Sequence, residues 1–374
     1  MLSPEYLQGC SEYAEELAAE LHTEIMNAII ARIHARMSPD FVFQGDKYLL
    51  TDTDAMRVEI LQEAGMLEQE VIDLIAEKTG LMKEEIRRAF VDAGVKSVKY
   101  DDEVYREAGL QVPDIRQSPY FLRLVERNYQ AVMSTVHNLT GTTALASQQL
   151  FIRTTDRMLN LTAMGAEGYT KAYYDAINEI ARQGLTITYP SGHTDTIEVA
   201  TLRALRTGIS QMSAQIGLAR MDEMDCDLVV VSSHFGARPS HQVWQGKIYS
   251  RSGKSRKYPN FEQSTGYGTG AGLCGWNCRH SFSPYFEGMG NPFDRYGVKE
   301  NKEAYDLSQR QRLLERRIRH TKRQISNEEQ AENFEEIEKL RKLLKRQNAA
   351  YREFCKENDL KPQAVRLAIA RGGN

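Results

Sequence analysis

The stretch GLCGWNCRHSF, residues 272–282, places two of the five cysteines of the chain, Cys274 and Cys278, beside Trp276 and His280. A second dense stretch, SSHFGARPSHQVWQG at residues 232–246, carries His234 and His241. Both stretches are short and interrupted by glycine. The concentration of rare side chains in them predicts one of three things: a metal site, a catalytic pair or the centre of a small core.

Imidazole nitrogen and cysteine thiolate are the ligands that zinc prefers, and a structural zinc site uses four of them in a tetrahedron. Two separated segments that each supply about two ligands therefore predict a structural zinc site. The candidate ligands are His234, His241, Cys278 and His280, with Cys274 as an alternate.

Two other interpretations of these residues stay open. There is no Cys-x-x-Cys motif, so the histidines could instead bond backbone carbonyls while the cysteines pack as small hydrophobes. Cys278 could also be a nucleophile activated by His280 or His241, with Arg279 lowering its pKa. No helix start or oxyanion arrangement is visible around Cys278, which disfavours that interpretation.

A basic and aromatic segment, GKIYSRSGKSRKYPNF at residues 246–261, follows the second stretch. Cations could meet phosphates there while the rings stack on bases, which predicts a nucleic-acid contact. The alternative is a solvated loop without a ligand. The candidate cations are Lys247, Arg251, Lys254, Arg256 and Lys257.

Outward from these stretches, the pattern is mainly helical. Leu17, Leu21, Ile25 and Ile29 recur at helical spacing, which predicts one helix from Pro4 to Met37. Further helices are expected from Asp54 to about Gly94, split near Gly65 and Gly80, and from Pro119 to Ala181, interrupted near Gly141 and Gly165.

Strands are expected only around the Cys/His stretches. GLTITYPSGHTDTIEV, from Gly184 onward, reads as a strand and turn before a helix, and the apolar run from Leu228 to Val231 reads as a buried strand. Residues 246–272 are expected to form a loop or irregular hairpin.

Residues 301–357 hold almost no glycine or proline and are dense in Glu, Arg and Lys, which predicts a helical hairpin or coiled-coil arm. Its second helix is expected to start at the capping-box spacing of Ser326 to Glu329. The expected fold class is therefore mainly α with a small α+β module. The expected domains are a helical region over 1–183, the module over 184–295 and a charged helical tail over 296–374.

The composition narrows the class of protein. The net charge of −3 over 374 residues implies no general affinity for nucleic acid or membranes. No apolar run approaches the ~20 residues that span a bilayer, and the N-terminal stretch does not read as a secretory signal. Five scattered cysteines favour a reducing compartment over a disulfide framework.

Three strings resemble the phage minor capsid protein 2 family, which is related to the Mu F-like head morphogenesis proteins. They are TITYPSGHTDTIEVATLRALRTG at 186–208, SSHFGARPSHQVWQGKIYS at 232–250 and YGTGAGLCGWNCRHSFSPYFEG at 267–288, and the resemblance covers roughly residues 1–350. The positions that match the motif are His234, Gly236, Arg238, His241, Trp244, Gly246, Gly272, Cys274, Gly275, Asn277, Cys278, Arg279 and His280.

The resemblance implies a structural, non-enzymatic component of a tailed-phage virion, made in the bacterial cytoplasm and present in several copies at the portal vertex or inside the head. It implies docking to the portal through the N-terminal helices, with the major capsid protein, the scaffold protein and packaged DNA as further partners. The alternative is a metal-dependent nuclease or DNA-binding head component. The absence of any acidic residue between Gly272 and Pro284 counts against a nuclease.

Overall fold

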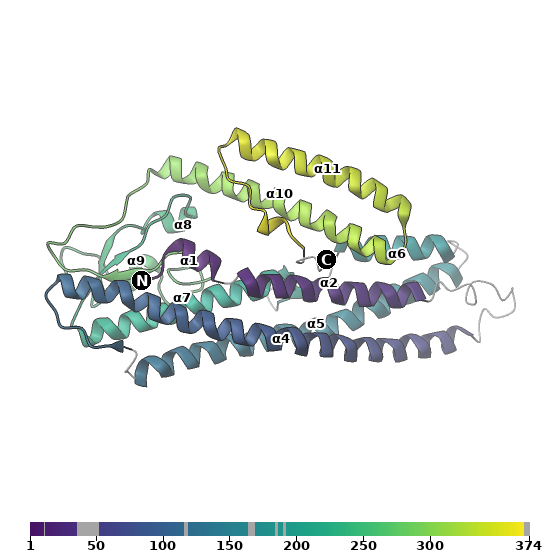
Figure 1. The fold of residues 1–374 in the computed structure, drawn as a ribbon, viewed down its shortest axis with the longest axis horizontal. Coiled ribbons are helices and arrows are strands. Elements are labelled where there is room, and N and C mark those ends of the chain that lie inside the picture. Colours follow the sequence, from purple (N-terminus) through teal and green to yellow (C-terminus); the bar gives the residue numbers. More distant parts are fainter. Residues whose placement is uncertain are drawn as a thin grey trace. The chain divides into compact units, whose positions relative to one another are not determined.

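In the part of the chain that it describes, the computed structural model is mainly helical, with one small antiparallel sheet and one short hairpin (Figure 1). The structure describes residues 1–10, 12–35, 52–115, 119–163, 169–183, 186–189 and 192–369. Among these residues, no helix combines the length and apolar content needed to cross a bilayer.

The described residues form two compact units, each built from separate stretches of the chain. The first unit contains Met1–Glu15, Met82–Val136 and Thr201–Gln309, and the second contains Glu16–Leu81, His137–Ala200 and Arg310–Asn374. The domains expected from the sequence were continuous stretches of the chain, and their boundaries near residues 183 and 295 stay a prediction.

Helices α1 (Pro4–Gly9) and α2 (Glu12–Ala35) occupy the N-terminal segment that was expected to hold one helix. The expected single helix is wrong, because α1 ends where the Cys10 N–H bonds the Tyr6 carbonyl in a C-cap. The apolar stripe of α2 is confirmed, since Leu21, Ile25 and Ile29 are fully buried. The predicted end at Met37 lies outside the described residues.

Helix α4 (Asp52–Glu107) runs without a break through Gly65 and Gly80, so the expected splits at these glycines are wrong. Helix α5 (Pro119–Ala163) likewise continues through Gly141. A glycine in a helix costs only about 1 kcal/mol relative to alanine, whereas each large apolar side chain that is fully buried contributes about 1.5–3 kcal/mol. Burial along these helices therefore outweighs their glycines. The interruption expected at Gly165 lies outside the described residues.

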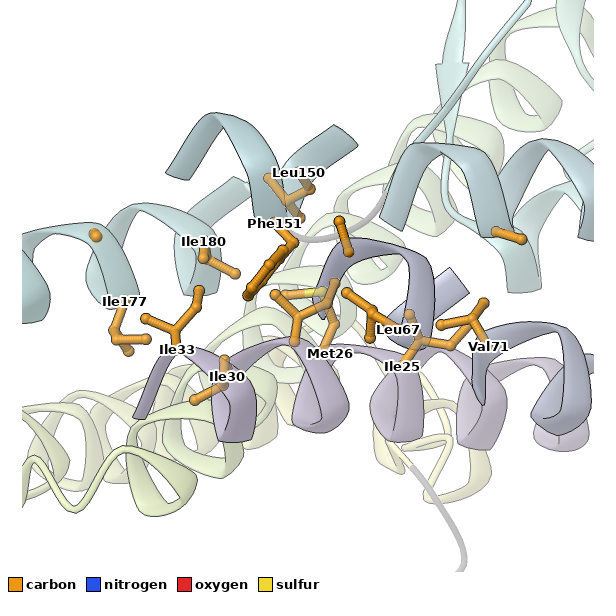
Figure 2. Packing of buried hydrophobic residues seen from close by; sticks show 14 of the residues in the cluster. Ile25, Met26, Ile30, Ile33, Leu67, Val71, Leu150, Phe151, Ile177 and Ile180 are labelled. Atoms are coloured by element: carbon orange, nitrogen blue, oxygen red, sulfur yellow. The ribbon is translucent and has the colours of Figure 1, made fainter. Parts of the chain in front are cut away.

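The core of the second unit lies where α2, α4, α5 and α6 (Tyr169–Gln183) meet. Figure 2 shows Met26 and Ile33 of α2 close to Phe151 of α5 and Ile180 of α6. A hairpin with two residues in each strand, β1 (Ile187–Thr188) and β2 (Thr194–Asp195), precedes the next helix. The expected strand is confirmed at Ile187–Thr188, whereas Gly184, Leu185 and the Pro190–Ser191 part of the expected turn lie outside the described residues.

Helix α7 (Ile197–Glu223) leads into the sheet of the first unit, whose strand order is β4-β3-β5 with all neighbours antiparallel. The central strand β3 spans Leu228–Val231, as the apolar run predicted. The segment expected as a loop also contains β4 (Ile248–Ser250) and the short helix α9 (Phe261–Thr265). Helix α8 (Pro239–Gln242) and β5 (Phe282–Pro284) complete the module.

Helices α10 (Val298–Gln330) and α11 (Phe334–Glu357) form the expected helical hairpin, followed by a 3-10 turn at Val365–Leu367 (Figure 1). Tyr351 of α11 closes it by donating a hydrogen bond from its hydroxyl to Glu315 of α10, at 3.0 Å. The start expected at Ser326 is wrong: α10 continues past it, and Asn333 caps α11 by accepting from the Glu336 N–H.

Candidate metal centre in the three-stranded module

The strand pairing of the first unit brings the two Cys/His stretches together. Val231 at the end of β3 lies opposite Phe282 at the start of β5, and the Ser232 N–H donates to the Ser281 carbonyl at 2.9 Å. The histidines next to these strand ends therefore meet, and the rings of His234 and His280 stack at 4.4 Å between centroids. His241 comes from α8, where Pro239 occupies the first turn.

The loop before β5 is folded too tightly for side chains at two of its glycines. A Cβ on Gly272 would lie 1.9 Å from the Gly266 carbonyl oxygen, and one on Gly275 would lie 2.3 Å from that of Gly270. Cys274 and Asn277 themselves adopt left-handed backbone conformations, with φ of 59° and 52°. This compact loop places Cys278 in the apolar core of the module.

Three of the predicted ligands converge in the core. The sulfur of Cys278 lies 3.8 Å from Nδ1 of His241 and 3.7 Å from Nδ1 of His280. The ligand atoms of all three residues lie within 4.8 Å of one another, and all three side chains are buried. Three of the four predicted ligands, His241, Cys278 and His280, are therefore neighbours in the structure, and the binding of a metal by them stays a prediction.

The outer nitrogen of each ring is bonded to a carbonyl-type oxygen. Nε2 of His241 lies 3.0 Å from the Ala271 carbonyl oxygen, and Nε2 of His280 lies 2.9 Å from Oε1 of Gln245. A carbonyl oxygen only accepts, so both Nε2 atoms carry the proton in the neutral rings. Both Nδ1 atoms then present lone pairs toward the sulfur of Cys278.

Gln245 belongs to the site although the sequence did not predict it. The orientation of its amide is fixed, because the backbone N–H of His234 donates to its Oε1 at 3.1 Å and its own Nε2 donates to Gln242 at 2.7 Å. The signal in the sequence was a polar residue directly after Trp244, within the stretch that carries His241.

Burial keeps the three groups uncharged. It lowers the pKa of His241 to about 4 and lowers that of His280 well below its usual value, with the positive charge of neighbouring histidines and arginines adding to the shift at His280. It also raises the pKa of the Cys278 thiol. A thiol held in its protonated form is a poor nucleophile, which disfavours the Cys/His catalytic interpretation.

The other two candidate ligands lie outside the converging group. The ring of His234 stacks on His280, and its Nδ1 lies 3.4 Å from Nη2 of Arg279. The sulfur of Cys274 is directed to the His280 carbonyl oxygen at 3.7 Å, and the residue is part of the apolar core with Leu273. As placed, His234 covers the site and Cys274 packs beside it.

Intramolecular contacts engage part of the basic segment. Lys247 donates to the Val243 carbonyl at 2.7 Å, Lys257 pairs with Glu287 at 2.9 Å, and Arg251 bonds the Cys226 carbonyl at 2.9 Å. Lys254 and Arg256 are exposed. The nucleic-acid contact predicted for this segment stays a prediction.

Comparison with known proteins gives matches over most of the chain. Residues 2–356 match the family described as "Phage minor capsid protein 2". A "Structural protein" of Lactococcus phage LL-H is 24% identical over 336 residues, which is 84% of this chain and 90% of that protein. A "Structural protein" of Lactococcus phage mv4 is 34% identical over 104 residues, which is 28% of this chain and 84% of that protein.

No solved structure matches the chain. The family match extends through the helices of both units, the three-stranded module and nearly all of α11. The resemblance seen in the sequence is thus confirmed over almost the full length: the chain belongs to the phage minor capsid protein 2 family.

Proposed function

We propose that this structural phage protein serves head assembly at the portal vertex, where it docks to the portal through its N-terminal helices. The observation that carries the proposal is the family match over residues 2–356, which leaves little of the chain for an unrelated activity. Two relatives named as structural proteins agree with a place in the virion.

Helix α4 offers a surface suited to a protein partner. Leu61 and Met66 of α4 are each 59% exposed in the second unit. Met66 and Leu74 line a shallow hollow on α4 together with the carboxylates of Glu70, Asp73 and Glu77. Apolar side chains rimmed by charge are typical of a protein contact site.

The candidate metal centre supports a structural role better than a nuclease. Its converging ligand atoms are two imidazoles and a thiol, and no carboxylate belongs to this group among the described residues. Hydrolytic metal sites combine an open ligand position with a general base. The three side chains are instead enclosed in the core of the module.

Mass spectrometry of purified proheads and virions tests the proposal. Tryptic peptides of this chain are expected in both particles, and cross-linking of proheads is expected to join α4 to the portal protein. Absence of the chain from both particles would refute a structural role.

A pair of double variants tests the surface on α4. Leu61→Lys with Met66→Lys is expected to reduce incorporation, because a charged ammonium takes the place of each apolar contact and would have to be desolvated on docking. The control is Val91→Lys with Val95→Lys, which adds the same charge at exposed apolar positions of the same helix, more than 20 residues away from Met66 in the sequence. Equal incorporation of the two double variants would remove α4 from the proposed interface.

A further inference from the structure

The arrangement of His241, His280 and Cys278 holds one proton too few for its acceptors. Both Nδ1 atoms present lone pairs, because both Nε2 protons are donated to carbonyl-type oxygens. The thiol of Cys278 has a single proton and faces both Nδ1 atoms. It can satisfy only one of them, so the other is a buried acceptor without a donor, which native structures avoid.

A metal ion in place of the thiol proton would satisfy all three atoms. A tetrahedral zinc with Zn–S near 2.3 Å and Zn–N of 2.0–2.1 Å places sulfur and nitrogen about 3.6 Å apart. The two observed sulfur-to-Nδ1 distances are 3.8 and 3.7 Å. Both sulfur-to-nitrogen distances are therefore close to the spacing that zinc requires, and all three ligand atoms lie within 4.8 Å of one another.

The surroundings of the rings match those of metal-bound histidines. A metal-binding imidazole almost always donates its other N–H to a carboxylate, backbone carbonyl or water, which fixes the tautomer and the ring orientation. The Ala271 carbonyl and the oriented amide of Gln245 supply such acceptors here. Thiolate and imidazole ligands without carboxylates favour zinc over magnesium or calcium.

We propose that Nδ1 of His241, Nδ1 of His280 and Sγ of Cys278 bind one zinc ion. On binding, the thiol releases its proton to solvent and the thiolate forms the bond to the metal. A fourth, non-protein ligand would complete the tetrahedron, and the converging group among the described residues contains no carboxylate that could act as a general base toward it. The ion adds a direct link between helix α8 and the loop before β5, which the bond from His241 to the Ala271 carbonyl already joins. Its role is to hold the module together.

Metal analysis of the full chain, purified without a histidine tag, is the first test. About one zinc per chain is expected, and a chelator should remove it with a loss of thermal stability, because metal binding is coupled to folding. Cobalt added to the chelated chain should produce a thiolate-to-cobalt absorption band. This titration uses the natural sequence, so it does not depend on whether a variant folds.

Two buried cysteines of the same core provide a matched pair. Cys278→Ser is expected to lose the cobalt band and to weaken metal binding at least tenfold. Cys274→Ser should keep the band and bind the metal as tightly as the natural chain. His241→Gln and His280→Gln should also weaken metal binding at least tenfold, although they keep the thiolate that gives the band. Two results would overturn the proposal. One is the absence of a band after cobalt is added to the chelated natural chain, and the other is an equal loss of metal affinity in Cys274→Ser and Cys278→Ser.

Discussion

Replacing Gly208 with alanine tests how closely helix α7 packs inside the first unit. A Cβ at this position would lie 2.2 Å from Cγ2 of Val132 in α5 and 3.3 Å from Cζ of Phe90 in α4. Carbon atoms in contact normally lie about 3.5–4.0 Å apart. Glycine at this position therefore permits an approach of α7 to α5 that any other residue would prevent.

The expected loss of stability follows from two opposing effects. Overpacking a core with an extra methyl typically costs about 1–3 kcal/mol. Alanine is better than glycine inside a helix by about 0.5–1 kcal/mol, which offsets part of that cost. Because the overlap with Val132 is large, we expect Gly208→Ala to lower the free energy of unfolding by about 2 kcal/mol.

The partner of the clash allows a rescue. Val132→Ala alone removes two buried methyl groups and should cost about 2 kcal/mol. In the Gly208→Ala background the same change also removes the overlapping Cγ2 atom, so it should cost less. We expect the double variant to be more stable than the sum of the single losses by about 1–2 kcal/mol.

Urea unfolding followed by tryptophan fluorescence is the assay. The two tryptophans of the chain, Trp244 and Trp276, both belong to the first unit, so the signal reports on the unit that contains Gly208. The control is Gly217→Ala on the same helix, where a Cβ would meet its neighbours only at 3.7 Å or more. A neutral or stabilised Gly208→Ala, or losses that simply add in the double variant, would refute the packing argument.

Three further predictions concern the module. Gln245→Met should weaken zinc binding by about 10–100-fold, because the acceptor for His280 is lost; an unchanged affinity in competition with a chelating dye would remove Gln245 from the site. Burial raises the pKa of Asp227, but bonds from Ser250 and Ser252 outweigh it and leave the folded pKa below 3.8. This carboxylate therefore stabilises the fold above pH 3.8 and loses that contribution as the pH falls further. Asp227→Asn should lower the free energy of unfolding at pH 7, and the difference from the natural chain should shrink in acid. A difference that does not change with pH would contradict this. If the exposed Lys254 and Arg256 meet DNA phosphates, replacing both with alanine should reduce the slope of log affinity against log salt by about 2 in filter binding, and an unaltered slope would exclude them.

Much of the fold could be predicted from apolar spacing, because burial is what stabilises these elements. The stripe of Leu21, Ile25 and Ile29 identified a buried helix face, and the β-branched run at Leu228–Val231 identified the central strand. Helix boundaries were less predictable. The capping-box spacing at Ser326 was a false signal, since α10 continues past it between the buried apolar residues Ile325 and Ala331.

The candidate site was predictable in its residue types and not in its geometry. Histidine and cysteine are rare enough for His241, Cys278 and His280 to stand out in the sequence. Which of the candidates converge depends on the pairing of β3 with β5 and on the fold of the loop after Gly266. Neither leaves a periodic signal, and the bond from Gln245 to His280 exists only once both segments have folded.

The glycines show why the sequence alone does not predict the role of a residue in the fold. Gly65 and Gly80 lie on an exposed helix surface with nothing within 4 Å of a Cβ, so they are tolerated and signal no break. Gly208 faces a side chain that could be shortened, whereas Gly272 faces a backbone carbonyl that no substitution can remove. Glycine therefore occurs at a position that tolerates a side chain, at one where a neighbouring side chain prevents it and at one where the backbone itself prevents it. The neighbour that decides among them lies far away in the sequence for Gly208 and only six residues away for Gly272, where the turn around Gly266 positions the loop that carries Cys278.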